Sequence, residues 1–503
     1  MRPAKNIALA LLALLTAASA MTACASDPGT NGIDTKDAQT DADTAAETIN
    51  YEDLTDLQKR QLMSDNLPEQ DWGGKEFRIA CSEEYDFHRE FLVDGQNGDQ
   101  CNDAVYSRNE KIESRFNVKI DILPQGAVDR EATPKFLNTI VMAGDDAAEL
   151  CAYVNYMAYI PIGAGSCLDW TEIAHVDLEQ PWHNKLANDG ATVNGKLFAI
   201  CSDLSISSMT YTYAIFFNTV LSSQYDMAPE VLYGLVDSGE WTIDKFIELT
   251  RELYVDTDGN GKKDETDTYG FAYNICNTGD VWMTAFDQPL TVIGDDGSLK
   301  VAFMSEKTDA ALTKMRDYQY NALGFCEYEE LYSEENYFAN GTVVFAPLRF
   351  SAAFGALRDM KDTYSILPYP KWDAAQEHYY TNADDKFQVF SVPKTAGDTE
   401  FIGMIYEALS AESYRSVYPA YYDVALKGKY TSDPVTADMI DLIMEGRKFE
   451  FSFQFGKEHF NRMPYLFRDL LLTPKLNLTS RWATVEKGIN KRLEEFYELF
   501  ADE

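Results

Sequence analysis

Strand-like and helical segments alternate along the chain from residue 75 onwards. Of all the features of the sequence, this alternation restricts the possible folds most. Residues 77–81 alternate in polarity as a strand with one buried face does, and 118–123 repeat that pattern. The stretch between them predicts a helix over 102–116, capped at Asn102 or Asp103. Because strands and helices keep alternating further along, we predict an α/β fold with mainly parallel strands.

The length of the chain implies more than one core. At 503 residues it exceeds the size at which a single hydrophobic core stops growing, and 45% of its residues are apolar. We therefore expect two or more lobes.

The first residues have the layout of a secretory signal. Arg2 and Lys5 form a short basic region, an apolar run covers 7–15, and small residues precede Cys24. The apolar run is too short to span a bilayer. The sequence "MTAC" resembles a bacterial lipobox, so we expect residues 1–23 to be a lipoprotein signal peptide and Cys24 to carry a lipid anchor on the extracellular face of the cell membrane.

An ordinary signal peptide, cut near "ASA" with Cys24 incidental, is the alternative interpretation of this segment. Residues 24–50 are acidic and small, with almost no large apolar side chains. Such a composition does not offset the entropy lost on ordering, which predicts a flexible tether.

The chain has a strong excess of acidic residues, and this limits the classes of molecule that it can bind. The formal net charge is -39, so polyanions are repelled, and we expect no nucleic acid and no membrane contact except through the anchor. A divalent cation fits better. Besides Cys24 the chain has seven cysteines without metal-like spacing, and we expect free buried thiols, with some disulfides as the alternative.

The stretch "DTDGNGKKDETDTYGF" predicts a structural calcium site. Calcium-binding loops of the EF-hand type place oxygen ligands at positions 1, 3, 5, 7 and 9, with glycine at position 6. Counted from Asp256, Gly261 takes the glycine position, and Glu265 can replace a long carboxylate missing at position 12, where Asp267 stands. The predicted metal ligands are Asp256, Asp258, Asn260, Lys262 through its carbonyl oxygen, Asp264 and Glu265.

The flanks of this loop argue against a calcium sensor. Lys263 occupies the position where paired sensor loops carry an apolar residue, and "TYGFAY" leaves the loop as a strand rather than a helix. A solvated acidic turn without a bound cation is the other interpretation.

Several motifs together resemble one protein family. The segment "GEWTIDKFIELTRELYVDTDGNGKKDETDTYGF", followed in order by "YFANGTVVFA" and "SILPYPK", and preceded by "NGKLFAI" and "YAIFFNTVL", resembles the solute-binding proteins of bacterial carbohydrate ABC transporters. These are family 1 proteins with the type II periplasmic-binding-protein fold. The resemblance covers roughly residues 75 to 500, and in related sugar-binding members the acidic loop holds calcium.

The resemblance implies two α/β lobes that close on a ligand in the cleft between them. Each lobe would hold a mixed, mostly parallel sheet with flanking helices. The first lobe would comprise residues 75–204 and 376–428, and the second 205–375 and 429–503. The implied function is a non-enzymatic receptor that captures an oligosaccharide or sugar derivative and delivers it to ABC permease subunits, as a monomer.

Sugar clefts combine aromatic rings with side chains that make paired hydrogen bonds. Such residues stand in loop-like places along this chain, although ordinary packing is the alternative for each of them. The predicted ligand-binding residues are Tyr85, Trp182, Asn184, Asp203, Trp282, Arg349, Tyr421 and Tyr422. Trp241 precedes the helix cap Thr242 and is assigned to packing.

The sequence contains no recognisable catalytic motif that would support an enzyme. A secreted glycoside hydrolase needs two placed carboxylates, which the sequence does not exclude. Nucleophile-elbow, zinc-protease, P-loop and dinucleotide-binding motifs are absent from the sequence, and its five histidines are dispersed. A surface adhesin with a calcium module is a third class, but such modules come as paired repeats and this chain has one copy.

Overall fold

The computed structural model describes residues 51–126, 129–294, 299–327, 333–429, 434–455 and 460–500. The predicted signal peptide, the lipidation site Cys24 and the tether lie outside these ranges. The chain divides into two compact units, Met1–Asn66 and Leu67–Glu503.

The described part of the first unit holds a short 3-10 helix, Tyr51–Asp53, and helix α2, Asp56–Leu62. A reciprocal cap starts α2. The Thr55 hydroxyl accepts from the Gln58 backbone N–H at 3.3 Å, and the Gln58 side chain accepts from the Thr55 N–H at 2.9 Å.

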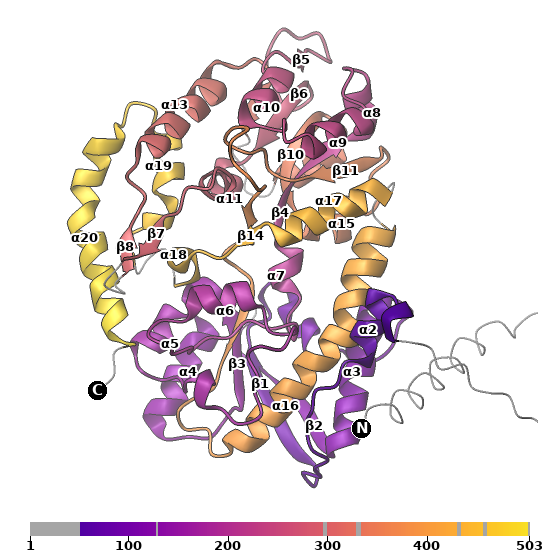
Figure 1. Ribbon diagram of the computed structural model, residues 1–503, viewed down its shortest axis with the longest axis vertical. Coiled ribbons are helices and arrows are strands. Elements are labelled where there is room, and N and C mark those ends of the chain that lie inside the picture. The colour runs from indigo at the N-terminus through magenta and orange to yellow at the C-terminus, as the bar shows by residue number, and fades with distance from the viewer. Residues whose placement is uncertain are drawn as a thin grey trace, which may run out of the picture. The chain divides into compact units, whose positions relative to one another are not determined.

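The second unit contains two main sheets, the first with strand order β13-β3-β1-β2 (Figure 1). Strands β1 (Lys75–Cys81), β2 (Val118–Pro124) and β3 (Leu150–Val154) are parallel, whereas β13 (Gln388–Ser391) runs antiparallel to β3. The two strands expected at 77–81 and 118–123 are confirmed.

The helix expected between those strands begins earlier than the sequence predicted. Helix α3 covers Gln100–Phe116, and its cap is Asp99, whose carboxylate accepts from the N–H groups of Cys101 and Asn102. Asp103, predicted as a cap, instead accepts from the N–H groups of Asn97 and Gly98 and closes the preceding turn. The cap prediction was therefore wrong, because two acidic residues four apart compete for the same role.

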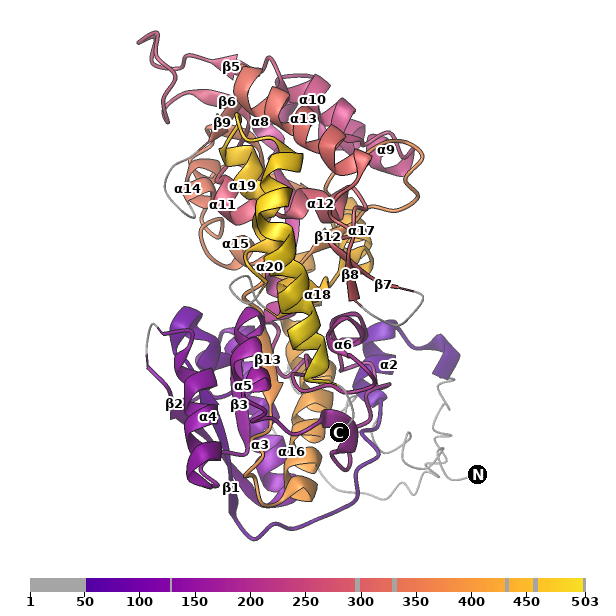
Figure 2. The ribbon, with the colours of Figure 1, turned by 90° about the vertical axis from the view of Figure 1, so that its left-hand side faces the viewer.

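Helices cover both faces of the first sheet. Figures 1 and 2 show α4 (Ala132–Ala143) and α5 (Tyr159–Gly163) on one side, with α3 and α16 (Thr399–Glu412) on the other. Phe401 of α16 packs edge-on against Phe77 of β1, with ring centroids 5.8 Å apart. The predicted α/β fold class is confirmed.

The second sheet has six strands, in the order β11-β4-β10-β6-β5, with β9 also paired to β6. The six strands are β4 (Tyr213–Asn218), β5 (Tyr254–Val255), β6 (Thr268–Tyr273), β9 (Phe325–Glu327), β10 (Val343–Arg349) and β11 (Tyr364–Leu367). Strand β4 runs antiparallel to both β10 and β11, while β6 is parallel to β10 and to β9. This sheet is therefore mixed rather than mainly parallel. The chain enters the second sheet at β4 from the side of the first sheet, so β4 points away from the first sheet and runs opposite to β10 and β11.

Helices and small sheets complete the second unit. The larger helices beside the second sheet are α9 (Pro229–Asp237), α10 (Ile243–Thr250) and α13 (Glu306–Asn321). The remaining short elements are α6 (Lys185–Ala191), α8 (Thr219–Ser223), α11 (Ile275–Thr278), α12 (Val281–Ala285), α14 (Ser333–Ala339), α15 (Ser351–Phe354), β7 (Thr291–Ile293), β8 (Leu299–Val301), β12 (Thr381–Asn382) and β14 (Arg447–Lys448). Trp241, assigned to packing, is buried and donates its indole N–H to the Pro368 carbonyl at 2.9 Å.

Within the described ranges, three segments cross between the sheets. Helix α7 (Ser207–Thr210) leads into β4, and the segment around β12 leads back to β13, with Thr212 and Ala383 of these two segments bridged. The third crossing continues α16 through two π-helical segments, Ser413–Val417 and Ala420–Lys429. The strands of each sheet fall within the ranges expected for one lobe, and the lobe boundaries themselves stay a prediction.

The C-terminal helices follow the third crossing. They are α17 (Pro434–Glu445), α18 (Phe451–Gln454), α19 (Leu466–Leu472) and α20 (Leu478–Glu498). Among the described residues, no helix is both long and apolar enough to cross a membrane. Cys81, Cys151, Cys167 and Cys201 are buried free thiols, as expected.

Candidate functional site

Segments that follow strands of both sheets meet between the sheets. Tyr213 begins β4 directly opposite Arg349, which ends β10. Both contact Asp384, just before β13 of the first sheet. The Tyr213 hydroxyl donates to its carboxylate at 2.8 Å, and an Arg349 guanidinium nitrogen lies 3.4 Å away. The carboxyl end of β10 thus faces the first sheet, the side on which open α/β sheets bind ligands.

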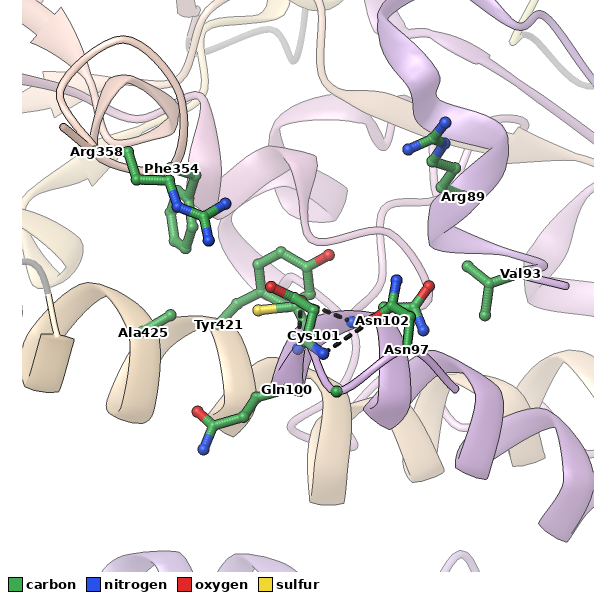
Figure 3. A pocket seen from close by; sticks show the side chains of 12 residues that line it. Arg89, Val93, Asn97, Gln100, Cys101, Asn102, Phe354, Arg358, Tyr421 and Ala425 are labelled. Carbon is green, nitrogen blue, oxygen red and sulfur yellow. Dashed lines mark hydrogen bonds between the residues drawn. The ribbon is translucent and has the colours of Figure 1, made fainter. Parts of the chain in front are cut away.

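A cavity of about 970 Å³ lies at this junction and is drawn in Figure 3; it is called the larger cavity below. It draws on the segment after β1, the start of α3, the segment after β10 and the π-helical crossing. The lining residues are Arg89, Val93, Asn97, Gly98, Asp99, Gln100, Cys101, Asn102, Phe354, Arg358, Tyr421 and Ala425.

Two aromatic rings and several amide side chains face this larger cavity. The rings of Phe354 and Tyr421 lie with centroids 5.7 Å apart and offer an apolar surface. The amide side chains of Asn97, Gln100 and Asn102 supply hydrogen-bonding groups. This combination of rings with polar groups matches what a sugar presents, which is apolar C–H faces and hydroxyl groups.

A half-buried carboxyl group lies next to the lining residue Arg89 in the sequence. The carboxyl group of its neighbour Glu90 accepts a short hydrogen bond from the Ser205 hydroxyl. Burial raises the pKa of Glu90 to about 8, against the lowering effects of the Ser205 hydrogen bond and of the Arg108 guanidinium.

The smaller cavity has a volume of about 350 Å³ and a dense set of charged side chains. Its lining residues are Arg130, Tyr213, Cys276, Asp280, Val281, Asn382, Asp384, Asp385, Lys386, Phe453, Arg462, Tyr465 and Arg468. They follow β2 of the first sheet, begin β4 or follow β6 of the second, lie on the middle crossing segment, or belong to the C-terminal segment. Side chains from widely separated parts of the sequence thus converge on one cavity.

Ion pairs order the charges of the smaller cavity. Arg468 lies 2.9 Å from Asp280, and Lys386 lies 2.8 Å from Asp384. The Tyr465 hydroxyl donates to Asp385. Because these pairs are largely buried, they fix the geometry of the crossing segment against the C-terminal helices.

The two paired aspartates have opposite pKa shifts. Burial raises the pKa of the Asp280 carboxyl, and the Arg468 guanidinium 2.9 Å away opposes this rise. Burial alone would also raise the pKa of Asp384, but the Lys386 ammonium and the Arg349 guanidinium together hold it below its ordinary value. Asp384 is thus a permanent anion between the sheets.

Two of the predicted ligand-binding residues lie at this junction. Tyr421 lines the larger cavity, with its ring against that of Phe354. Arg349 pairs with Asp384 and Glu335, and its guanidinium lies over the Tyr211 ring, 4.8 Å from the centroid. A ligand role for these two residues stays a prediction.

Two predicted ligand-binding residues, both tryptophans, lie in the core. Trp182 is fully buried and donates its indole N–H to Glu407 at 3.0 Å, while His183 contacts the other oxygen of Glu407 at 2.8 Å. Trp282 of α12 is also fully buried, with its ring 5.1 Å from that of Tyr369. Each indole has a packing role in this arrangement, and a ligand role stays a prediction.

The remaining predicted ligand-binding residues have local roles. Asn184 caps α6 by accepting from the Ala187 N–H at 3.1 Å. Asp203 donates its backbone N–H to the Trp182 carbonyl at 2.8 Å. Tyr422 is buried and donates to Asp441 at 2.6 Å. The side chain of Tyr85 lies outside the described part of the structure.

Most of the residues that line the two cavities were not predicted from the sequence. The charged cluster at Asp384, Asp385 and Lys386 stands between two strand-like segments, in "NADDKFQVF", and this position gave a usable signal. Arg468 and Asp280 gave none, because each is an ordinary charged residue in a helical stretch until folding brings them together. Arg89 and Arg358 are likewise indistinguishable in sequence from surface arginines.

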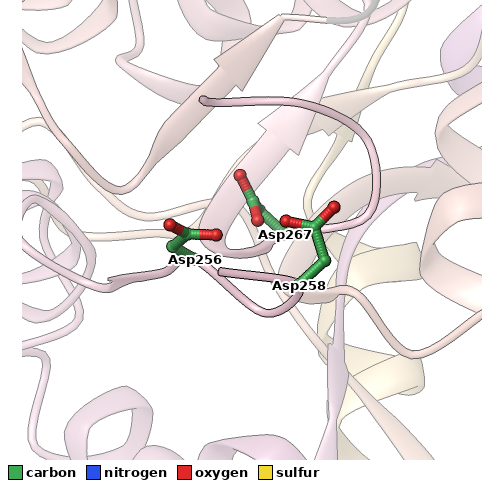
Figure 4. Close-up of side chains that lie close together, drawn as sticks. All are labelled: Asp256, Asp258 and Asp267. Carbon is green, nitrogen blue, oxygen red and sulfur yellow. The ribbon is translucent and has the colours of Figure 1, made fainter. Parts of the chain in front are cut away.

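The acidic loop gathers three carboxylates at one point (Figure 4). One oxygen each of Asp256, Asp258 and Asp267 lies within 4.8 Å of the others. Asp267 is fully buried, whereas Asp258 is exposed. Clustered carboxylate oxygens are hard ligands suited to Ca²⁺, and a cation offsets the repulsion between them. The donor set therefore fits the predicted ion.

The other predicted metal ligands differ in their arrangement. The side chains of Asn260 and Asp264 are joined by a 2.8 Å hydrogen bond, and the Lys262 carbonyl accepts from the Tyr254 hydroxyl at 3.4 Å. Glu265 instead accepts a hydrogen bond from Tyr337. Asp267 thus joins the cluster, whereas Glu265 was the residue predicted to replace it as a ligand. The backbone N–H groups of Thr257 and Asp264 hold the Asp267 carboxylate in place by hydrogen bonds of 3.0 and 3.1 Å.

Comparison with solved structures identifies the fold. An ABC substrate-binding protein from Listeria monocytogenes in complex with cycloalternan is 13% identical, with a TM-score of 0.51 over 84% of this chain and 99% of the other. A solute-binding protein from Thermotoga lettingae bound with α-D-tagatose is 14% identical, with a TM-score of 0.51 over 85% and 100%. A cyclo/maltodextrin-binding protein complexed with maltotetraose is 13% identical, with a TM-score of 0.53 over 84% and 97%.

Sequence-level comparisons add nothing to this result. No family model matches the chain, and no curated protein matches it. At these identities the structural matches show that the chain has the fold of ABC transporter solute-binding proteins. The expected two-lobed α/β architecture is confirmed.

Proposed function

We propose that this chain, which has the fold of ABC transporter solute-binding proteins, is the extracellular receptor of a carbohydrate importer. One observation carries the proposal. A cavity of about 970 Å³ between the two sheets combines the Phe354 and Tyr421 rings with amide side chains. The bound sugars of structures with this fold, named above, support the ligand class.

The proposed mechanism needs no covalent chemistry. The ligand binds between the lobes, and burial of its surface shifts an equilibrium from open to closed forms. Residues of both sheets contribute to the larger cavity, so a closed form completes the site and an open form exposes it. ABC permease subunits would then receive the ligand from the closed receptor, a monomer held at the extracellular face of the membrane by a lipid on Cys24.

We infer in addition that the loop over 256–267 holds a structural calcium ion. The proximity of Asp256, Asp258 and Asp267 supports it, and Asn260, Asp264 and the Lys262 carbonyl are further oxygen donors beside them. When bound, the ion offsets the repulsion between the carboxylates and ties the turn after β5 to the start of β6. It would act on stability rather than on the sugar site.

A glycan panel tests the receptor function. Calorimetry and thermal shift of the mature chain should reveal a sugar that binds without being consumed, and a Tyr421→Leu variant should weaken binding of that sugar. Turnover of a glycoside by the purified chain would instead support the alternative, a secreted hydrolase. Absence of binding to every saccharide, with no turnover, would leave the receptor proposal without a ligand and overturn it.

A further inference from the structure

Two arginines face the larger cavity from different sheets. Arg89 follows β1 of the first sheet, and Arg358 follows β10 of the second. Figure 3 shows them on opposite sides of the cavity, with Tyr421 between them. A ligand in the cavity would therefore meet a guanidinium from each lobe.

Neither arginine is strongly neutralised. Arg89 lies 3.9 Å from Asp86, and both side chains are exposed. The attraction between two charges in this geometry is weak because water screens it. In the described part of the chain, Arg358 has no carboxylate within ion-pair distance. Among the described lining residues the one carboxylate is that of Asp99, which accepts from the N–H groups of Cys101 and Asn102 at the start of α3.

The charge of the cavity linings runs against that of the chain. The full sequence has 82 acidic and 43 basic residues. The two cavity linings together hold six cationic side chains and four carboxylates. Of those carboxylates, Asp280 and Asp384 are paired with Arg468 and Lys386, and Asp385 accepts from Tyr465. In this acidic protein, the described linings of the two cavities therefore hold more cationic side chains than carboxylates.

We propose that the larger cavity binds an acidic carbohydrate, with the acid group held between Arg89 and Arg358. This inference rests on the proposed receptor function. Arginine makes paired, charge-assisted hydrogen bonds to carboxylates and sulfates, and these are stronger than hydrogen bonds between neutral groups. A neutral ligand would leave two like charges facing each other as the lobes close, whereas an anion attracts both and favours closure.

Matched pairs of saccharides provide the test. Calorimetry on the mature chain would compare trigalacturonate with its methyl ester, and a sulfated disaccharide with its desulfated form. We expect one acidic form to bind at least about tenfold more tightly than its neutral partner. That preference should shrink at high salt. The pair that shows it distinguishes a carboxylate from a sulfate as the recognised group.

Substitutions locate the effect. Arg358→Gln should reduce the acid preference to about twofold or less, and Arg89→Gln should reduce it in the same direction. Arg492→Gln, an exposed arginine of the distant helix α20, is the control and should keep the preference in full. Thermal unfolding of each variant checks that it is folded.

Each outcome decides between the two proposals. Equal or tighter binding of the neutral forms overturns the acidic-ligand inference while supporting the receptor function. An acid preference that survives in the double variant Arg89→Gln, Arg358→Gln overturns the location. Failure of all four saccharides to bind overturns this inference, and only failure of the full neutral panel as well counts against the receptor function.

Discussion

The acidic loop takes its three clustered carboxylates from one short run of residues, 256–267, whereas the two cavities draw on segments as distant as Arg89 and Arg468. The loop is local, so its spacing in sequence reflects its geometry in space. The cavities depend on how two sheets and their crossing segments meet. Residue type alone then says little about which side chains line them.

Trp182 gives the largest test of this difference, because its residue type favours the cleft and its location is the core. We expect Trp182→Ala to lower the free energy of unfolding by about 3–5 kcal/mol through the cavity it leaves. Affinity for a sugar found in the panel should stay unchanged. Denaturant unfolding and calorimetry measure the two effects.

A milder variant keeps this test decisive if the alanine variant does not fold. Trp182→Phe keeps an aromatic ring but removes the indole N–H that donates to Glu407 at 3.0 Å. It should cost about 1.5–3 kcal/mol, as loss of a hydrogen bond to a charged group does. Weakened sugar binding with unchanged stability would instead place this indole in the cleft and break the comparison.

Chelation of calcium tests the acidic loop, and its expected effect on the free energy of unfolding is the next largest. With calcium at 100 times its dissociation constant, binding to the folded state alone stabilises it by about 2.7 kcal/mol. Excess EGTA should therefore lower the melting temperature without any sugar present. A melting curve unaffected by EGTA, with no calcium in the purified protein, would remove the metal site.

Two carboxylate variants sharpen this result. Asp267→Asn should abolish the response to EGTA, because Asp267 belongs to the cluster of three carboxylates. Glu265→Gln should retain the response, since the Glu265 carboxylate accepts from Tyr337 instead. If Glu265→Gln also abolished the response, the ligand predicted from sequence would be correct and the cluster would rearrange on binding calcium.

The sequence predicted several strands and helices, and it placed Asp256 and Asp258 in one acidic loop, whose calcium site stays a prediction. Periodicity located β1, β2 and the body of α3, because apolar spacing follows directly from which face is buried. It did not locate the partners of Arg468 or Arg349, since Asp280 and Asp384 reach them only after the sheets are placed. It also missed the antiparallel position of β4, which depends on the direction from which the chain enters the second sheet.

Tyr421 and Tyr422 make the smallest and finest test, because they are sequence neighbours with different surroundings. Tyr421 lines the larger cavity beside Phe354, whereas Tyr422 is buried and donates to Asp441 at 2.6 Å. Both residues belong to the π-helical segment Ala420–Lys429, and neighbouring residues of a helix lie on different faces of it. Sequence spacing gave both the same prediction.

Tyr421→Leu should weaken sugar binding by about two- to tenfold, the equivalent of losing one aromatic contact of about 0.5–1.5 kcal/mol. Tyr422→Phe should keep the affinity and lower the free energy of unfolding by about 1 kcal/mol, since it loses only its hydrogen bond to Asp441. Calorimetry and denaturant unfolding on both variants separate the two roles. If both variants lost affinity equally, the π-helical segment would act as one unit in the cleft, and topology would not divide ligand residues from packing residues at this point.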